Sequence, residues 1–205
     1  MKEINLPITT TYSIECQVKD LPSEGVLNQS SRTTIPLGSI NIADHEGDGD
    51  IARANGGKIL YATTSIEKRL EKIISDYIFG LYLSENKRRA FFENELLKAS
   101  ILQLSFKKQL VKKIVQQGKY LKGKERESLE KKLADILKWR NAFAHGTLKC
   151  DNHGKWILKY YSNGNKAQNL DDAFWDRVVR TFENCNESLR KIDGALSKEL
   201  IFSIK

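Results

Sequence analysis

Apolar residues recur every three or four positions through the middle of the chain, which predicts a series of amphipathic helices. The clearest begins near Thr64, because Thr64 and Glu67 have the spacing of a capping box and apolar positions follow at helical spacing as far as Leu81. The same periodicity predicts further helices over about residues 87–98 and 106–117. The middle of the chain is therefore expected to be a helical bundle.

Two other regions alternate apolar and polar residues, which is typical of half-buried strands. One covers residues 12–18, with a second short extended piece near 40–42. The other covers residues 148–160 around the turn sequence at 151–154, and it predicts a β-hairpin. A further turn is expected at residues 163–165.

Apolar residues at helical spacing return near the C-terminus and predict a last helix, capped by Asp171 or Asp172. Trp139 and Trp175 are expected to be packing residues, and so are Phe91 and Phe92, which are not expected to serve as stacking platforms for bases. The apolar positions of the last helix are Phe174, Val178, Phe182, Leu189 and Ile192.

Polar and glycine residues dominate positions 44–57, so this stretch is expected to be a loop and to mark a domain boundary. The chain then divides into a β-containing N-terminal extension over residues 1–60 and a helical domain over 61–205. The acidic residues at 44–50 imitate a calcium-binding loop, but Asn55 stands where such a loop needs its bidentate glutamate. Neither a metal site nor a cofactor is expected.

The helix that follows Gly118 and Gly123 leads into the sequence Trp139-Arg140-Asn141-Ala142-Phe143-Ala144-His145-Gly146. Arg140 lies four residues after Ile136, on the same predicted face, so a guanidinium interrupts an apolar stripe. Burying an unpaired charge costs several kcal/mol or more, so Arg140 should meet an acidic partner or look into a cleft that can bind an anion.

Arg140 and His145 lie roughly 140° apart on an ideal helix, so they do not share a face. For both to act on one substrate, the helix must end before His145, with Gly146 as the stop, or a second subunit must complete the site. Asn141 lies one helical turn before His145 and could orient the imidazole by a hydrogen bond.

This stretch resembles the signature of the HEPN superfamily, which is Arg, a polar residue, a few further residues and then His. Arg140-Asn141, three intervening residues and His145-Gly146 fit that pattern. The small Ala144 and the helix that leads into the motif also look like the family, and the resemblance covers about residues 61–200. Residues 1–60 resemble no family in the same way.

The resemblance implies a HEPN-like, mainly α bundle that usually forms a homodimer, and the hairpin predicted from the alternation would follow its motif helix. It also implies a metal-independent endoribonuclease in which Arg140, Asn141 and His145 are catalytic. A histidine can transfer protons near neutral pH, and a guanidinium matches phosphate oxygens. The RNA 2′-hydroxyl would attack the adjacent phosphate and leave a 2′,3′-cyclic phosphate, so DNA should be inert.

Members of the family include toxins and defence effectors, and some are non-catalytic modules that bind RNA or a protein partner. One branch carries a tyrosine two residues after the histidine that its antitoxin modifies, and this chain has Thr147 there. Control by another antitoxin or regulatory protein therefore stays open. The alternatives to the nuclease are a non-catalytic HEPN module and an unrelated helical protein.

A net charge of +8 over 205 residues favours a polyanionic partner such as RNA. Much of the excess lies close to the motif, although a solvated helix face is the simpler explanation for any single lysine. The candidate RNA-binding lysines are Lys107, Lys108, Lys112, Lys113 and Lys138.

Three widely spaced cysteines, Cys16, Cys150 and Cys185, match neither a disulfide framework nor a zinc site and favour a reducing compartment. The N-terminal residues lack the apolar core of a signal peptide, and no uncharged apolar run approaches the length of a membrane span. The protein is expected to be cytoplasmic and to have no membrane partner.

Overall fold

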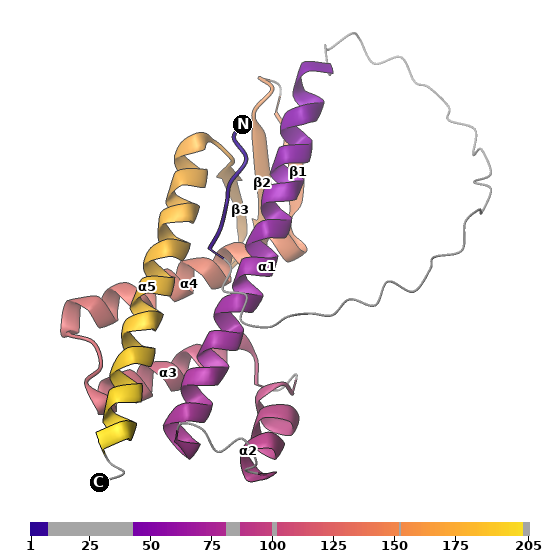
Figure 1. The fold of residues 1–205 in the computed structure, drawn as a ribbon. Coiled ribbons are helices and arrows are strands. Elements are labelled where there is room, and N and C mark those ends of the chain that lie inside the picture. The colour runs from indigo at the N-terminus through magenta and orange to yellow at the C-terminus, as the bar shows by residue number, and fades with distance from the viewer. Residues whose placement is uncertain (8–42, 81–86, 100–101, 152, 203–205) are drawn as a thin grey trace, which may run out of the picture.

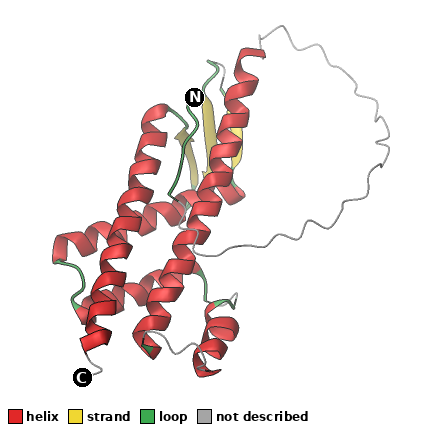
Figure 2. Ribbon diagram, viewed as in Figure 1, coloured by secondary structure: helices red, strands yellow, loops and turns green. Residues whose placement is uncertain are grey.

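The computed structural model describes residues 1–7, 43–80, 87–99, 102–151 and 153–202, which form a mainly helical fold with one small antiparallel sheet (Figures 1 and 2). The mainly α prediction is thus confirmed at the level of fold class. The elements are α1 (Ala43–Phe79), α2 (Lys87–Phe91), the π-helix η1 (Phe92–Leu97), α3 (Leu104–Gly118), α4 (Gly123–His145), β1 (Thr147–Cys150), β2 (Trp156–Tyr161), β3 (Asn165–Asn169) and α5 (Asp172–Phe202).

The two long helices α1 and α5 lie side by side and run in the same direction, while α3 and α4 cross behind them (Figure 1). The first half of α1 covers the sheet. The C-terminal end of the motif helix α4 lies against the sheet.

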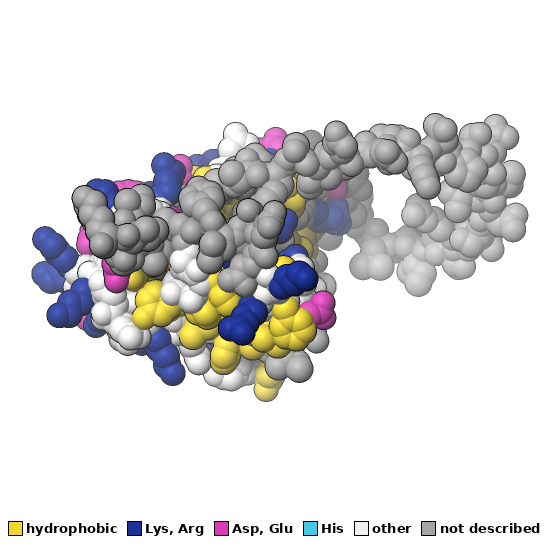
Figure 3. Space-filling view, turned by 60° about the horizontal axis from the view of Figure 1, so that its bottom comes forward, with side chains coloured by type: hydrophobic (Ala, Val, Ile, Leu, Met, Phe, Trp, Pro, Cys, Tyr) yellow, Lys and Arg dark blue, Asp and Glu magenta, His cyan; other side chains and the backbone are white. Residues whose placement is uncertain are grey.

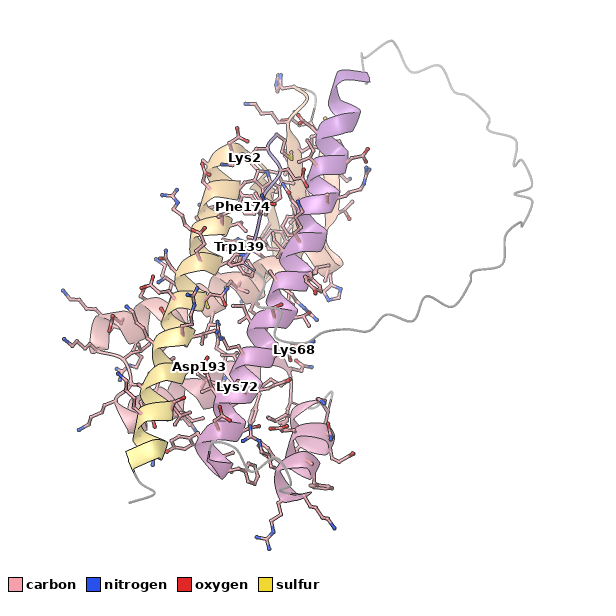
Figure 4. All side chains as sticks on the ribbon, viewed as in Figure 1. Lys2, Lys68, Lys72, Trp139, Phe174 and Asp193 are labelled. Carbon is pink, nitrogen blue, oxygen red and sulfur yellow. The ribbon has the colours of Figure 1, made fainter. Side chains whose placement is uncertain are left out.

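An aromatic cluster joins α4 to α5. The rings of Trp139 and Phe174 meet edge to face with centroids 5.9 Å apart, and Phe174 meets Trp175 in the same way at 4.9 Å (Figure 4). Phe143 lies 6.0 Å from Trp175. Trp139 and Trp175 are buried, so their predicted role in packing is confirmed.

Residues 44–57 are not a loop, because they form the first part of α1. Two of their glycines allow close packing: a Cβ on Gly49 would come 2.5 Å from the Trp156 ring of β2, and one on Gly56 would come 2.7 Å from the Phe143 ring of α4. Close approach to two aromatic rings explains glycine at positions seven residues apart, which is two helical turns. The prediction of a glycine-rich loop was wrong because it took packing glycines for turn residues.

The predicted helix start at Thr64 is also wrong, because α1 begins at Ala43 and crosses residue 60 without a break. The Thr64 hydroxyl donates a hydrogen bond to the Leu60 carbonyl, as hydroxyls inside helices do. The helix ends at Phe79, where Gly80 adopts a φ of +80° and its N–H bonds the Asp76 carbonyl at 2.9 Å.

Residues 1–7 form an extended segment between α1 and α5 (Figure 1). The buried Asn55 accepts a hydrogen bond from the Ile4 N–H at 3.0 Å and donates one to the Lys2 carbonyl at 3.0 Å. Asn186 of α5 donates to the Pro7 carbonyl at 3.3 Å. This part of the predicted extension therefore packs into the helical core, whereas the strands predicted over residues 12–18 and 40–42 lie outside the described residues.

The hairpin after α4 is confirmed, with Leu148 opposite Leu158 in the β1–β2 register. The Asp151 carboxylate holds its turn by accepting backbone N–H bonds from His153 and Lys155. A third strand, β3, pairs with β2 and was missed, because its sequence Asn165-Lys166-Ala167-Gln168-Asn169 has no apolar alternation. Because most side chains of this edge strand are exposed to solvent, the strand does not need alternating apolar residues.

The predicted helices over residues 87–98 and 106–117 match α2 with η1 and α3. Phe92 packs against Phe79 with centroids 5.4 Å apart, but Phe91 is 62% exposed, so its predicted core role is wrong. Figure 3 looks at the end of the molecule where α1 finishes and shows hydrophobic side chains grouped there among lysines and arginines.

The last helix is capped by Asp171, whose carboxylate accepts the Phe174 N–H at 2.7 Å. Its predicted apolar positions are all buried. Arg69 of α1 reaches Asp193 of α5 at 3.1 Å, and this contact lies in the lower half of the bundle (Figure 4). None of the helices in the described ranges combines the length and hydrophobicity that a membrane span needs.

Candidate functional site

The motif helix α4 extends through His145 and stops at Gly146, whose N–H bonds the Ala142 carbonyl at 2.7 Å. Gly146 has an extended backbone, so it is not a left-handed cap. A Cβ there would lie 2.9 Å from the Lys159 carbonyl oxygen and 2.3 Å from the Ala142 oxygen. Glycine at this position lets β2 pack directly on the end of the motif helix.

Arg140 lies outside the core, contrary to the prediction that it interrupts the buried stripe. The apolar face of α4 continues from Ile136 through Trp139 and Ala142, both buried, and leaves Arg140 exposed at its edge. Within the described residues no carboxylate forms an ion pair with the guanidinium, which donates a hydrogen bond to the Asn141 side-chain oxygen at 2.9 Å.

A pocket of about 690 Å³ lies beside this end of α4, and Arg140, Asn141 and His145 all border it. The helix does not end before His145, and Arg140 and His145 nevertheless border the same pocket. The side-chain oxygen of Asn141 accepts from Arg140, and no bond joins Asn141 to His145 in the described structure. The other residues that line the pocket are Glu67, Lys98, Ala99, Leu102, Gln103, Leu104, Ser105, Lys107, Leu137, Tyr160 and Tyr161.

One wall of the pocket is a buried ion cluster. The Lys107 ammonium of α3 lies 2.6 Å from carboxylate oxygens of both Glu67 and Glu71 on α1, and the lysine side chain is 4% exposed. Burial by itself lowers the pKa of Lys107, but the hydrogen bonds to Glu67 and Glu71 outweigh it and the net shift is upward. Lys107 is therefore a buried ammonium whose charge is compensated by two glutamates. It is not the free phosphate contact that the sequence predicts.

The other predicted RNA-binding lysines do not line this pocket. Lys112 pairs with Glu130 at 2.7 Å, and Lys108 and Lys112 border a second hollow of about 380 Å³ between α3 and α4. Lys113 and Lys138 are exposed on α3 and α4. The predicted RNA-binding lysines therefore lie on several surfaces of the protein and not around one pocket.

Sequence reasoning missed three groups at the pocket, namely Lys98, Glu67 and the tyrosine pair Tyr160 and Tyr161. Lys98 follows η1 and donates to the Asn94 side chain at 2.7 Å. The sequence pattern predicts Glu67 as part of a helix capping box and Tyr160 as an alternating residue of a β-strand. The position of the hairpin in the sequence could have indicated the tyrosines, because the second strand of a hairpin directly after the motif returns beside His145.

The arrangement brings together an exposed guanidinium, an imidazole and an amide at one pocket, with Lys98 and the glutamate-paired Lys107 also on its border. A guanidinium can hold a phosphate by two parallel hydrogen bonds, and an imidazole can accept or donate a proton. These groups suit the binding and rearrangement of a phosphodiester.

Comparisons of the chain with protein-family models, curated proteins and solved structures give no match.

Proposed function

We propose that the protein is a HEPN-type endoribonuclease that cleaves RNA without a metal ion and acts as a homodimer. The observation that carries the proposal is that Arg140, Asn141 and His145, the three residues of the motif, border one open pocket. The pocket is large enough for a nucleotide-sized group, because ligand pockets typically measure about 300–1,000 Å³.

Arg140 is the group that would bind the scissile phosphate. Its guanidinium is permanently charged and exposed, and it donates its hydrogen bond to the neutral amide of Asn141 and not to a carboxylate. Charge increases on the non-bridging oxygens as the phosphate becomes five-coordinate, so a positioned cation stabilises the transition state more than the bound substrate. Asn141 holds the guanidinium at the pocket through the 2.9 Å hydrogen bond.

His145 would transfer a proton during cleavage. The 2′-oxygen of the ribose bonds to phosphorus while its proton passes to a base, the bond from phosphorus to the 5′-oxygen breaks, and the 5′-oxygen takes up a proton. The products are a 2′,3′-cyclic phosphate and a 5′-hydroxyl. One imidazole can perform one of the two transfers at a time, and a water molecule would perform the other.

The central experiment compares purified wild type with His145→Ala on labelled RNA and on DNA of the same sequence in EDTA, with mass analysis of the product ends. The wild type should cleave the RNA alone and leave a 2′,3′-cyclic phosphate. His153→Ala is the matched control, because His153 is an exposed histidine in the hairpin turn and does not border the pocket. It should retain cleavage.

Absence of cleavage in several classes of RNA, with RNA binding retained, would replace the nuclease by a non-catalytic HEPN module. DNA cleavage, or a 3′-phosphate without the cyclic intermediate, would contradict attack by the 2′-hydroxyl. Activity that survives in His145→Ala would remove His145 from the mechanism.

The dimer is tested by mixing Arg140→Ala with His145→Ala after mild denaturation and refolding. If each site takes its arginine and histidine from different copies, a mixed dimer retains one intact site and cleavage returns. If each chain forms its own site, the mixture stays inactive. Light scattering on the wild type measures the dimer directly.

An RNA-cleaving enzyme in the cytoplasm harms the cell that makes it unless it is controlled. The proposal therefore includes a role as a toxin or defence effector with an antitoxin or other regulatory protein. Growth arrest on expression, relieved by His145→Ala and not by His153→Ala, is the expected result in cells.

A further inference from the structure

Tyr161 is an exposed aromatic side chain on the border of the motif pocket. It lies at the end of β2, is 80% exposed, and shares the pocket with Arg140 and His145. Resting on the proposed function, we propose that Tyr161 stacks on an unpaired base beside the scissile phosphate, so that the substrate is single-stranded RNA or an unpaired loop.

The position of Tyr161 is held by the packing beneath it. Gly146 brings β2 against the end of α4, and the half-buried Tyr160 packs on the hydrophobic core one residue before Tyr161. The next residues turn back at Asn163 and Gly164, both of which have positive φ. The ring is therefore presented to solvent from a short, well-anchored strand end and not from a long loop.

The surroundings of Tyr161 suit a nucleotide better than an apolar partner. The pocket that it borders carries Arg140 and Lys98 together with the amide of Asn141, while its third cation, Lys107, is paired with Glu67 and Glu71. Proteins that bind single strands combine such cations for the backbone with an aromatic ring for the base. Among the exposed aromatic residues that the structure describes, Tyr61, Phe91 and Phe106 do not line this pocket, whereas Tyr161 does.

Stacking on Tyr161 requires a base that is free of its partner. In an A-form duplex each base is paired and stacked between its neighbours, so neither of its faces is free for an aromatic side chain. In-line attack by the 2′-hydroxyl also needs a flexible backbone, which an unpaired nucleotide provides. Both requirements select against duplex RNA.

The test measures binding separately from cleavage. His145→Ala is the background, so that the RNA survives, and the probe is an RNA of about ten nucleotides with a fluorescent label, free or annealed to its complement. A second probe carries 2-aminopurine, a base whose fluorescence is quenched by stacking. The variants are Tyr161→Ala, Tyr161→Phe and the control Tyr61→Ala, an exposed tyrosine of α1 outside the pocket.

Tyr161→Ala should weaken binding of the single strand about tenfold or more and remove the 2-aminopurine quenching. Tyr161→Phe should retain both, because the phenyl ring stacks without the hydroxyl, and Tyr61→Ala should change neither. The duplex should bind more weakly and without dependence on Tyr161. An exposed side chain can be truncated without unfolding the protein, and a thermal melt of each variant checks this.

Equal binding of the single strand by Tyr161→Ala, or a duplex that binds as tightly as the single strand, would overturn the inference. The two proposals fail separately. If the wild type cleaves single-stranded RNA and Tyr161→Ala does so at the same rate, the stacking role fails and the nuclease stands. If no RNA is cleaved but binding depends on Tyr161, the nuclease fails and the stacking role stands.

Discussion

Gly56 of α1 lies so close to Phe143 of α4 that a Cβ at Gly56 would come within 2.7 Å of the Phe143 ring. This approach lets α1 and α4 pack closely two residues before His145. The same helix, α1, then places Glu67 at the pocket about three turns further along. The glycine that the sequence pattern places in a loop therefore allows close packing of two helices that both contribute residues to the pocket.

Gly56→Ala should destabilise the protein by about 1–3 kcal/mol, because the added methyl must displace a packed ring. Gly57 is the matched control, since it lies on the same helix, is exposed, and a methyl group added there would meet no atom within 4 Å. Gly57→Ala should stabilise by about 0.5–1 kcal/mol through the lower entropy of the unfolded chain. Urea unfolding of both variants measures the difference, and equal effects would argue against the close packing.

Lys107→Met should destabilise by about 2–4 kcal/mol, less than for a fully buried pair because Glu67 and Glu71 keep some contact with water. The substitution leaves two carboxylates facing each other without a cation. Lys113→Met removes an exposed lysine of the same helix and should change the free energy of unfolding by less than about 0.5 kcal/mol. Lowering the pH to protonate the glutamates should restore part of the loss, and a loss that does not depend on pH would contradict the charge explanation.

Arg140→Ala should change the free energy of unfolding by less than about 1 kcal/mol, because the side chain is exposed and its hydrogen bond is to a neutral amide. RNA cleavage should nevertheless fall by about 100-fold or more, as expected for a lost transition-state contact. Arg190→Ala, an exposed arginine of α5, controls for the loss of one positive charge and should leave cleavage intact. A large loss of stability in Arg140→Ala would indicate a structural arginine.

Asn55→Ala should cost about 1–3 kcal/mol, because it leaves the buried Ile4 N–H and the Lys2 carbonyl without their hydrogen-bond partner. The amide of Ile4 should then exchange its hydrogen faster, as the segment over residues 1–7 detaches from between α1 and α5. Asn184→Ala, on the exposed face of α5, is the control and should leave that exchange rate unchanged.

Cys185 should resist alkylation by iodoacetamide at about pH 8.5, whereas the exposed Cys150 should react. Burial raises the pKa of the Cys185 thiol to about 12, so its thiolate is scarce in the folded state. Because the folded state holds this proton more tightly than the unfolded state, the contribution of Cys185 to stability is lost as pH rises from the ordinary thiol value of 9.0 toward 12. Peptide mapping of labelled native protein measures both sites, and equal labelling would show that the helix α5 opens.

The sequence by itself determined the regular elements that carry a strong local signal. The apolar periodicity of α3 and α5, the hairpin turn at Asp151 and the stop at Gly146 are properties of short stretches, so they were readable without a fold. The motif Arg140, Asn141 and His145 was found in the same way, since its signal is spacing along one helix.

Only the tertiary structure decided where those elements meet. Gly49 and Gly56 lie in a helix because two aromatic rings pack against them, and no local pattern distinguishes such glycines from loop glycines. Lys107 became a buried structural cation because two glutamates come from a helix about 40 positions earlier in the chain. Tyr161 reached the motif pocket because β2 returns against the end of α4. Each of these depends on contacts between residues distant in sequence, and periodicity along one element carries no information about its partners.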